Sequence, residues 1–232
     1  MVSSTSEGIP RVITLDGLSG SGKSTLARLL ANQLGWIYLD SGAWYRALTW
    51  VALKREIDVK STEEVLELLL NINIDSTIDG SVVVDGIVLG EELRSPKIDK
   101  AVSSVADHVP VRKELNRQMR KILAREGTKG IVADGRDVGS VVFPNSPLKV
   151  FVEAPLEERA RRRFVQHQTR GLDVSFTDVF NALQTRDVRD SQRGEAAPQA
   201  QPSSYLLENQ NNSVEQAVGR LLSWSNKIFI KK

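Results

Sequence analysis

Short apolar runs alternate with longer stretches of helical periodicity along most of the chain. Runs of the kind found in buried strands occur at 11–16, 36–39, 129–133 and 148–153, and a shorter one at 205–207. Between them, apolar residues recur every three or four positions, which predicts helices. Strands that alternate with helices favour a parallel sheet covered on both faces. We therefore expect an α/β fold with a five-stranded parallel sheet flanked by helices.

Several of the expected helices have recognisable starts. Asp40 or Ser41 can cap a helix that runs to about Lys54. Capping boxes begin at Ser61 and at Ser213, each with a Glu or Gln three residues later. The remaining helices are expected at about 26–34, 97–107, 110–125, 155–169 and from about 177.

Residues 72–90 have a different texture from the rest of the chain. Apolar and polar residues alternate there, and Asp79-Gly80 and Asp85-Gly86 are dipeptides typical of tight hairpins. We predict a small antiparallel sheet of about three short strands, inserted into the α/β frame.

A glycine-rich loop joins the first strand to the first helix. Its pattern is G-x-x-x-x-G-K-S, in the strand–turn–helix context that binds nucleotide phosphates. Glycines let backbone N–H groups curl around an oxyanion, and the helix that follows presents its positive end. A turn that merely caps a helix is the alternative, but the spacing and the Lys-Ser-Thr favour a phosphate loop. The loop comprises Gly17, Leu18, Ser19, Gly20, Ser21, Gly22, Lys23, Ser24 and Thr25. Lys23 is expected to reach the β- and γ-phosphates and the Ser24 hydroxyl to bind Mg²⁺.

Polar residues follow two other strands of the expected sheet. Ser41, Tyr45 and Arg46 lie on the first turns of the helix after the second strand. The third strand ends in Asp134-Gly-Arg-Asp137, whose first carboxylate suggests a ligand of Mg²⁺ or of its water. Ligands bind at the carboxyl edge of open α/β sheets. A capped helix and a simple Asp-Gly turn remain alternatives on position alone.

Arginine is concentrated in one stretch of the chain. Guanidinium matches phosphate oxygens better than an ammonium does, whereas a solvated helix face is the alternative for any single member. Between residues 155 and 195 every cationic side chain is an arginine: Arg159, Arg161, Arg162, Arg163, Arg170, Arg186, Arg189 and Arg193. Helical offsets put Arg186, Asp190 and Arg193 on one face, where they can clamp a phosphate and a sugar hydroxyl.

Composition excludes several classes of function. The 232 residues contain no cysteine, which rules out disulfides, thiolate zinc sites and thiol catalysis and fits a reducing cytoplasm. A net charge of +2 is too small to argue for nucleic acid as a partner. Residues 1–10 lack a secretory apolar region, and no run approaches the ~18 apolar residues of a membrane span.

Taken together, these stretches resemble the bacterial cytidylate kinases, which are nucleoside monophosphate kinases of the P-loop class. The resemblance covers about residues 10–230. It is carried by the motifs at 13–25, 39–46, 131–144, 157–163 and 186–190.

The resemblance implies transfer of phosphate from ATP, with Mg²⁺, to CMP and dCMP in pyrimidine metabolism, by a monomer without nucleic-acid or membrane partners. Lys23, Arg136, Arg162 and Arg186 would be catalytic. The phosphate loop with Arg159 and Arg163 would bind ATP, and Ser24 and Asp134 would bind the metal. The acceptor would contact Ser41, Tyr45, Arg46, Ser103, Arg112, Arg136, Asp137, Arg186, Asp190 and Arg193.

The resemblance also implies a division of the chain. Residues 1–10 would be disordered and 11–232 would form a single kinase domain. Its core would comprise 11–40, 126–154 and 195–232, its acceptor-binding region would span about 41–110, and its arginine-rich lid about 157–175. Two alternatives stay open: a P-loop kinase for UMP, AMP or an alcohol, and a nucleotide-binding switch without catalysis.

Overall fold

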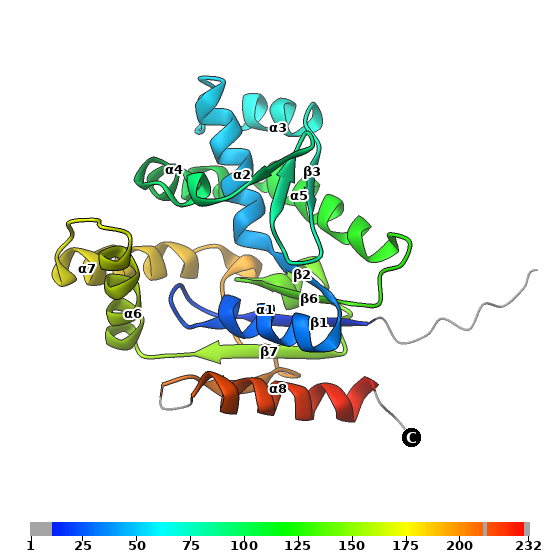
Figure 1. The fold of residues 1–232 in the computed structure, drawn as a ribbon. Helices are drawn as coiled ribbons and strands as arrows, with labels where there is room; N and C mark the ends of the chain where they lie inside the picture. Colours follow the sequence, from blue (N-terminus) through cyan, green and yellow to red (C-terminus); the bar gives the residue numbers. More distant parts are fainter. Residues whose placement is uncertain (1–10, 211–212, 230–232) are drawn as a thin grey trace, which may run out of the picture.

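A five-stranded parallel sheet is the centre of the computed structural model, which describes residues 11–210 and 213–229 (Figure 1). The strand order is β2-β6-β1-β7-β8, and every neighbouring pair is parallel. The expected sheet is thus confirmed. The strands are β1 (Val12–Asp16), β2 (Ile37–Asp40), β6 (Ile131–Gly135), β7 (Leu148–Glu153) and β8 (Tyr205–Glu208).

Helices connect the strands in the order that the periodicity predicts. Asp40 accepts a hydrogen bond from the Ala43 amide and so caps α2, and Ser61 caps α3. The α-helices are α1 (Lys23–Leu34), α2 (Ser41–Lys54), α3 (Thr62–Leu70), α4 (Pro96–Asp107), α5 (Val109–Lys121), α6 (Leu156–Thr169), α7 (Phe176–Ser191) and α8 (Val214–Phe229). Short helical turns are η1 (Glu91–Arg94), η2 (Ile122–Ala124), η3 (Val138–Val142) and η4 (Gly194–Ala196).

Both faces of the sheet are buried, because successive residues of each strand point to opposite sides. On β1, Val12 packs into the cluster that contains residues of α2 and α5, whereas Ile13 and Leu15 pack against α1 and α8. On β6, Ile131 and Val132 divide in the same way. The near-continuous apolar runs of the sequence therefore reflect burial from two sides, with α1 and α8 on one face and α2 and α5 on the other.

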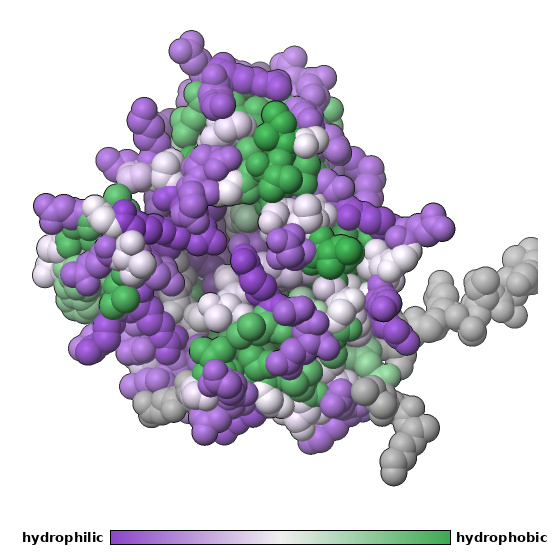
Figure 2. Space-filling model, in the orientation of Figure 1, coloured by the Kyte–Doolittle hydropathy of each residue, from purple (hydrophilic) through white to green (hydrophobic). Residues whose placement is uncertain are grey.

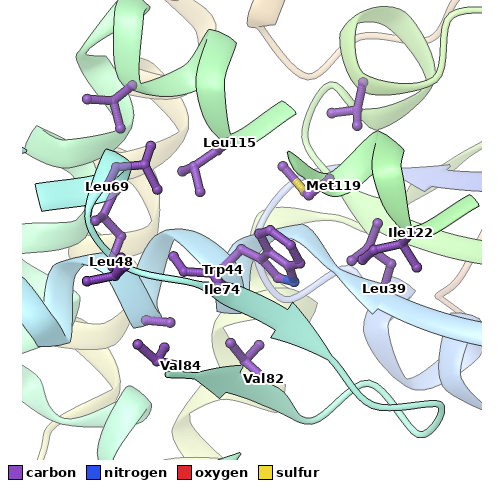
Figure 3. Packing of buried hydrophobic residues seen from close by; sticks show 14 of the residues in the cluster. Leu39, Trp44, Leu48, Leu69, Ile74, Val82, Val84, Leu115, Met119 and Ile122 are labelled. Atoms are coloured by element: carbon purple, nitrogen blue, oxygen red, sulfur yellow. The ribbon is translucent and has the colours of Figure 1, made fainter. Parts of the chain in front are cut away.

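The inserted sheet is confirmed as an antiparallel meander. It consists of β3 (Ile74–Ser76), β4 (Val82–Val84) and β5 (Ile87–Leu89), in that order. Positive φ angles at Asp85 and Gly86 form the second hairpin turn. The sheet packs on the α2 side of the core (Figure 3), where the Trp44 indole donates a 2.7 Å hydrogen bond to the Ser76 hydroxyl. That bond fixes the insertion to α2.

Helices α6 and α7 pair beyond the carboxyl ends of the strands and share a small core of their own around Ala160, Val179 and Leu183. Three details differ from the sequence expectation. Helix α5 ends at Lys121 and continues as the tighter turn η2; the π-turn η3 after β6 has no sequence signal; and α7 ends at Ser191. Arg193 consequently lies in the turn after α7, not on its face.

The predicted disorder of residues 1–10 lies outside the described residues. Within the described part of the chain, none of the helices is long and apolar enough to cross a membrane.

Candidate active site

The phosphate loop curls around the start of α1 at the carboxyl edge of the sheet. Gly20 and Gly22 have φ angles of 80° and 93°, in the region that favours glycine. Lys23 is buried, and its ammonium donates a 3.1 Å hydrogen bond to the Leu18 carbonyl across the loop. Burial, together with the nearby charge of Arg136, lowers the pKa of Lys23. The loop thus holds a desolvated cation, which an anion would stabilise.

Asp134, at the end of β6, faces the phosphate loop from the neighbouring strand. The Ser24 hydroxyl donates to one of its carboxylate oxygens at 2.7 Å, and the Tyr38 hydroxyl donates to the other at 2.8 Å. Burial raises the pKa of Asp134, and the nearby carboxylate of Asp40 adds to the shift. A carboxylate beside a hydroxyl is a hard-oxygen donor set of the kind that Mg²⁺ prefers, with the remaining ligands left to water and phosphate.

A chain of alternating charges follows Asp134 along the site. The Arg136 Nε donates to the buried Asp190 carboxylate at 2.9 Å, and Arg193 Nη1 donates to the other oxygen of Asp190 at 2.6 Å. Burial opposes the ionisation of Asp190, but these two arginines outweigh it and hold its pKa below the usual range. Arg193 is held in turn by Asp107 of α4, at 3.0 and 3.1 Å.

Arg186 is the least compensated cation of the site. Its Nε is buried without a hydrogen-bond partner, and its guanidinium forms no ion pair with any described residue. Burial, and then the charge of Arg136, lowers its pKa. The residue as a whole is half-buried. A partly desolvated charge without an ion-pair partner is unfavourable, so this position favours an anionic ligand.

Arg46 and Arg163 meet at a carboxylate that no sequence motif contains. Asp99 of α4 accepts from Arg46 Nη2 at 2.6 Å through one oxygen and from Arg163 Nη2 at 3.3 Å through the other. Arg46 also donates to the Leu93 carbonyl at 3.1 Å. In Figure 2 the surface between α4 and the pair of helices α6 and α7 is hydrophilic.

Two of the residues expected to contact the base, Arg112 and Asp137, are paired with each other. Arg112 forms an ion pair with Asp137 and stacks its guanidinium 6.0 Å from the centre of the Tyr45 ring. Burial raises the pKa of Asp137, while Arg112 opposes the shift. Ser103 is half-buried on α4. The Ser41 hydroxyl, by contrast, donates to the Asp134 carbonyl at 2.8 Å, which ties it to the end of β6.

Two lid arginines hold the outside of the phosphate loop. Arg159 is buried and binds the Ala154 and Ser19 carbonyls and the Asp187 carboxylate. Arg162 donates to the Ser21 carbonyl at 3.2 Å and to the Asn209 carbonyl at 2.5 Å. In this structure both arginines brace the loop, and their expected contacts with ATP stay predictions.

Sequence reasoning missed three residues of this region. Tyr38 is a buried strand residue by pattern, and Asp99 is one helical carboxylate among several. Asn209, just after β8, donates a 2.8 Å hydrogen bond from its side chain to the Ser21 carbonyl. Only for Asn209 was there a signal, because a polar residue at the carboxyl end of a parallel strand faces the ligand edge.

Comparisons with known proteins agree with this geometry. The sequence profile of the family described as "Cytidylate kinase" matches residues 13–227. A cytidylate kinase of Pseudomonas syringae pv. tomato is 42% identical over 218 residues, which cover 91% of this chain and 93% of that protein. A cytidylate kinase of Azotobacter vinelandii is 40% identical over 92% of this chain and 94% of its own length. Among solved structures, an uncharacterized protein from Eubacterium ventriosum aligns with a TM-score of 0.52 at 12% identity, over 93% of this chain and 98% of that one, and supports the fold alone.

Proposed function

The chain belongs to the cytidylate kinase family, and on this premise we propose that it transfers the γ-phosphoryl group of ATP to CMP and dCMP, producing ADP and CDP or dCDP. We further propose that it acts as a monomer in the cytoplasm and needs Mg²⁺. Each substrate brings negative charge, so electrostatic repulsion is part of the barrier to transfer. Charge neutralisation and in-line positioning are therefore the main tasks of the site.

The observation that carries this proposal is the weakly compensated charge of Arg186. Its side chain is half-buried, its Nε is buried without a hydrogen-bond partner, and its guanidinium forms no ion pair with a described residue, although it lies near Arg136 and the buried Lys23. A phosphoryl group in transit between two nucleotides is the anion that such a site would stabilise most strongly.

The remaining residues support two separate nucleotide sites. The phosphate loop would bind the ATP phosphates through its backbone N–H groups and Lys23. Arg46, Arg136, Arg186 and Arg193 would surround the phosphate and sugar of the acceptor, with Asp190 fixing the orientation of Arg136 and Arg193 at 2.9 and 2.6 Å. Arg112 and Asp137 would recognise the base with Ser103, since paired donors and acceptors can discriminate the edge of cytosine.

The proposed transfer needs no dedicated general base. A nucleotide phosphate has a second pKa of about 6 and is already an anionic nucleophile near neutral pH. His108 is not available as such a base, because both of its ring nitrogens are engaged, by the Thr62 hydroxyl at 2.8 Å and the Val59 carbonyl at 2.9 Å. His108 therefore joins the turn between α4 and α5 to the start of α3.

Ser24 and Asp134 would hold Mg²⁺, directly or through water. The fit rests on their 2.7 Å contact and on the raised pKa of a buried carboxylate that a cation would relieve. Bound there, the ion would neutralise charge on the β- and γ-phosphates. The protein's part is to orient the hydroxyl and the carboxylate, which Tyr38 does for Asp134 at 2.8 Å.

A panel of phosphate acceptors tests the proposal. ADP release from ATP and Mg²⁺ is followed with CMP, dCMP, UMP, AMP and GMP side by side, and without any acceptor. We expect the highest kcat/KM with CMP and dCMP. A preference for AMP, or ADP release that does not depend on the acceptor, would contradict it.

A further inference from the structure

Asp99 lies where two substrate sites of the proposed kinase meet. It belongs to α4, in the acceptor-binding region, and one of its carboxylate oxygens is 2.6 Å from Nη2 of Arg46 on α2. The other oxygen is 3.3 Å from Nη2 of Arg163 on α6, in the lid region. The side chains of Arg46, Asp99 and Arg163 are 16%, 27% and 25% exposed. The three therefore form a half-buried bridge between elements assigned to different substrates.

The surroundings of this bridge are strongly cationic. Arg46, Arg170 and Arg94 all lie close enough to Arg163 to disfavour its charge, whereas Asp99 favours it. At Arg186, where burial and the charge of Arg136 disfavour the cation most, Asp190 and then Asp99 favour it. One carboxylate thus partly compensates several arginines that would otherwise repel one another across the cleft.

We propose that Asp99 is a positioning residue that makes the binding of ATP and of the acceptor nucleotide mutually dependent. Each of its oxygens serves one arginine, so an acceptor that orders Arg46 also fixes the carboxylate that orders Arg163. Arg163 is then already ordered before ATP arrives, so ATP binds more tightly. By linkage, bound ATP strengthens the binding of the acceptor by the same factor. This inference rests on the proposed function, because it assigns Arg46 to the acceptor and Arg163 to ATP.

Replacement of Asp99 by asparagine separates this role from simple packing. Asparagine has nearly the same shape but only one carbonyl oxygen, so it can accept from one arginine while its NH₂ group faces the other. The variant keeps the side-chain volume and loses the bridge. Glu157→Gln on α6 is a matched control, because it also removes one carboxylate charge, from an exposed pair with Arg161 at 3.5 Å.

The test is a pair of titrations on the full chain. The Kd of a non-hydrolysable ATP analogue is measured by calorimetry with and without saturating CMP, and the ratio of the two values is the coupling. For the native protein we expect tighter binding of the analogue with CMP. In Asp99→Asn the ratio should fall by roughly three- to fivefold, as for loss of a partly exposed ion pair worth about 1 kcal/mol. Glu157→Gln should retain the native ratio.

Arg163→Gln provides a second variant if the first folds poorly. It weakens binding of the analogue in both titrations, but the ratio should fall as in Asp99→Asn. The inference is overturned by a native ratio of one, or by variants that keep the native ratio. Its failure is separate from that of the proposed function, because CMP-dependent ADP release by the native protein tests the latter alone.

Discussion

The Ser24 hydroxyl donates a 2.7 Å hydrogen bond to the Asp134 carboxylate. This contact joins the first turn of α1 to the end of β6, across 110 positions of the chain. It brings the hydroxyl of the phosphate loop and the carboxylate of a neighbouring strand to one point at the carboxyl edge of the sheet. A bound Mg²⁺ would be held between these two groups.

Asp134→Asn should weaken the dependence on Mg²⁺. The amide keeps the shape but loses the negative charge, so we expect the Mg²⁺ concentration for half-maximal rate to rise about 10- to 100-fold. Tyr38→Phe is the comparison, because it removes the 2.8 Å hydrogen bond to Asp134 and leaves the charge. That variant should lose about 1–3 kcal/mol of unfolding free energy and change the Mg²⁺ requirement less. An unaltered requirement in Asp134→Asn would argue against the carboxylate as part of the metal site.

Arg186→Met should separate activity from stability. Loss of a buried charge contact with the transferred group should lower kcat/KM for CMP by an amount equivalent to about 2–5 kcal/mol. Because the side chain is half-buried, its Nε is buried without a hydrogen-bond partner and it forms no ion pair in the described part of the chain, methionine should raise the free energy of unfolding by about 1 kcal/mol. Steady-state kinetics and urea unfolding measure the two effects.

Arg117→Met is the control for this prediction. Arg117 lies on α5, is 54% exposed and pairs with Glu114 on the same helix. We expect native kinetics and a stability change within about 0.5 kcal/mol. Near-native turnover in Arg186→Met would remove Arg186 from the proposed mechanism.

Asn209→Ala should affect the ATP site selectively. Its side chain donates at 2.8 Å to the Ser21 carbonyl, and its backbone carbonyl accepts from Arg162 at 2.5 Å. Loss of the buried side-chain bond, worth about 1 kcal/mol, should raise the KM for ATP by roughly five- to tenfold and leave the KM for CMP near its native value. Asn71→Ala, which removes an exposed bond to the Glu67 carbonyl, should change neither. Equal increases in both KM values would point to general loosening of the fold.

Asp16 should make stability fall with rising pH. Its carboxylate accepts from the backbone amides of Val138 and Gly139 at 2.8 and 2.7 Å, yet burial raises its pKa from 3.8 to about 6. The folded protein therefore binds the proton more tightly than the unfolded chain does. Its contribution to stability is fully present below pH 3.8 and is lost as the pH rises through about 6.

The measurement compares native protein with Asp16→Asn, which cannot titrate. Relative to Asp16→Asn, the native protein should lose about 2–3 kcal/mol of unfolding free energy as the pH rises from about 4 to about 7. A difference that does not vary with pH would mean that Asp16 keeps its ordinary pKa in the folded state.

The local pattern of apolar and polar residues was sufficient to predict the strands and the hairpin turns of the inserted sheet. The strand at 11–16 is predicted because a strand buried on both faces needs a continuous apolar run, and β1 is buried at every position. The hairpin at Asp85-Gly86 is predicted because its φ angles, 49° and 82°, suit those residues. Where the pattern was weaker, at the end of α7, the expected helix ran past Ser191 and misplaced Arg193.

The residues of the candidate site likewise differ in whether local sequence or tertiary packing places them. The sequence by itself determined the phosphate loop, the parallel sheet and the residues that follow each strand, because these depend on backbone geometry within a few residues. Only the tertiary structure decided that Asp99 binds Arg46 and Arg163, 53 and 64 positions away, and that Asn209 closes on Ser21 across 188 positions. A surface carboxylate and a site carboxylate have the same local signature, so the packing of α4 against α2, and the approach of α6 that brings Arg163 to Asp99, select the partner of each arginine.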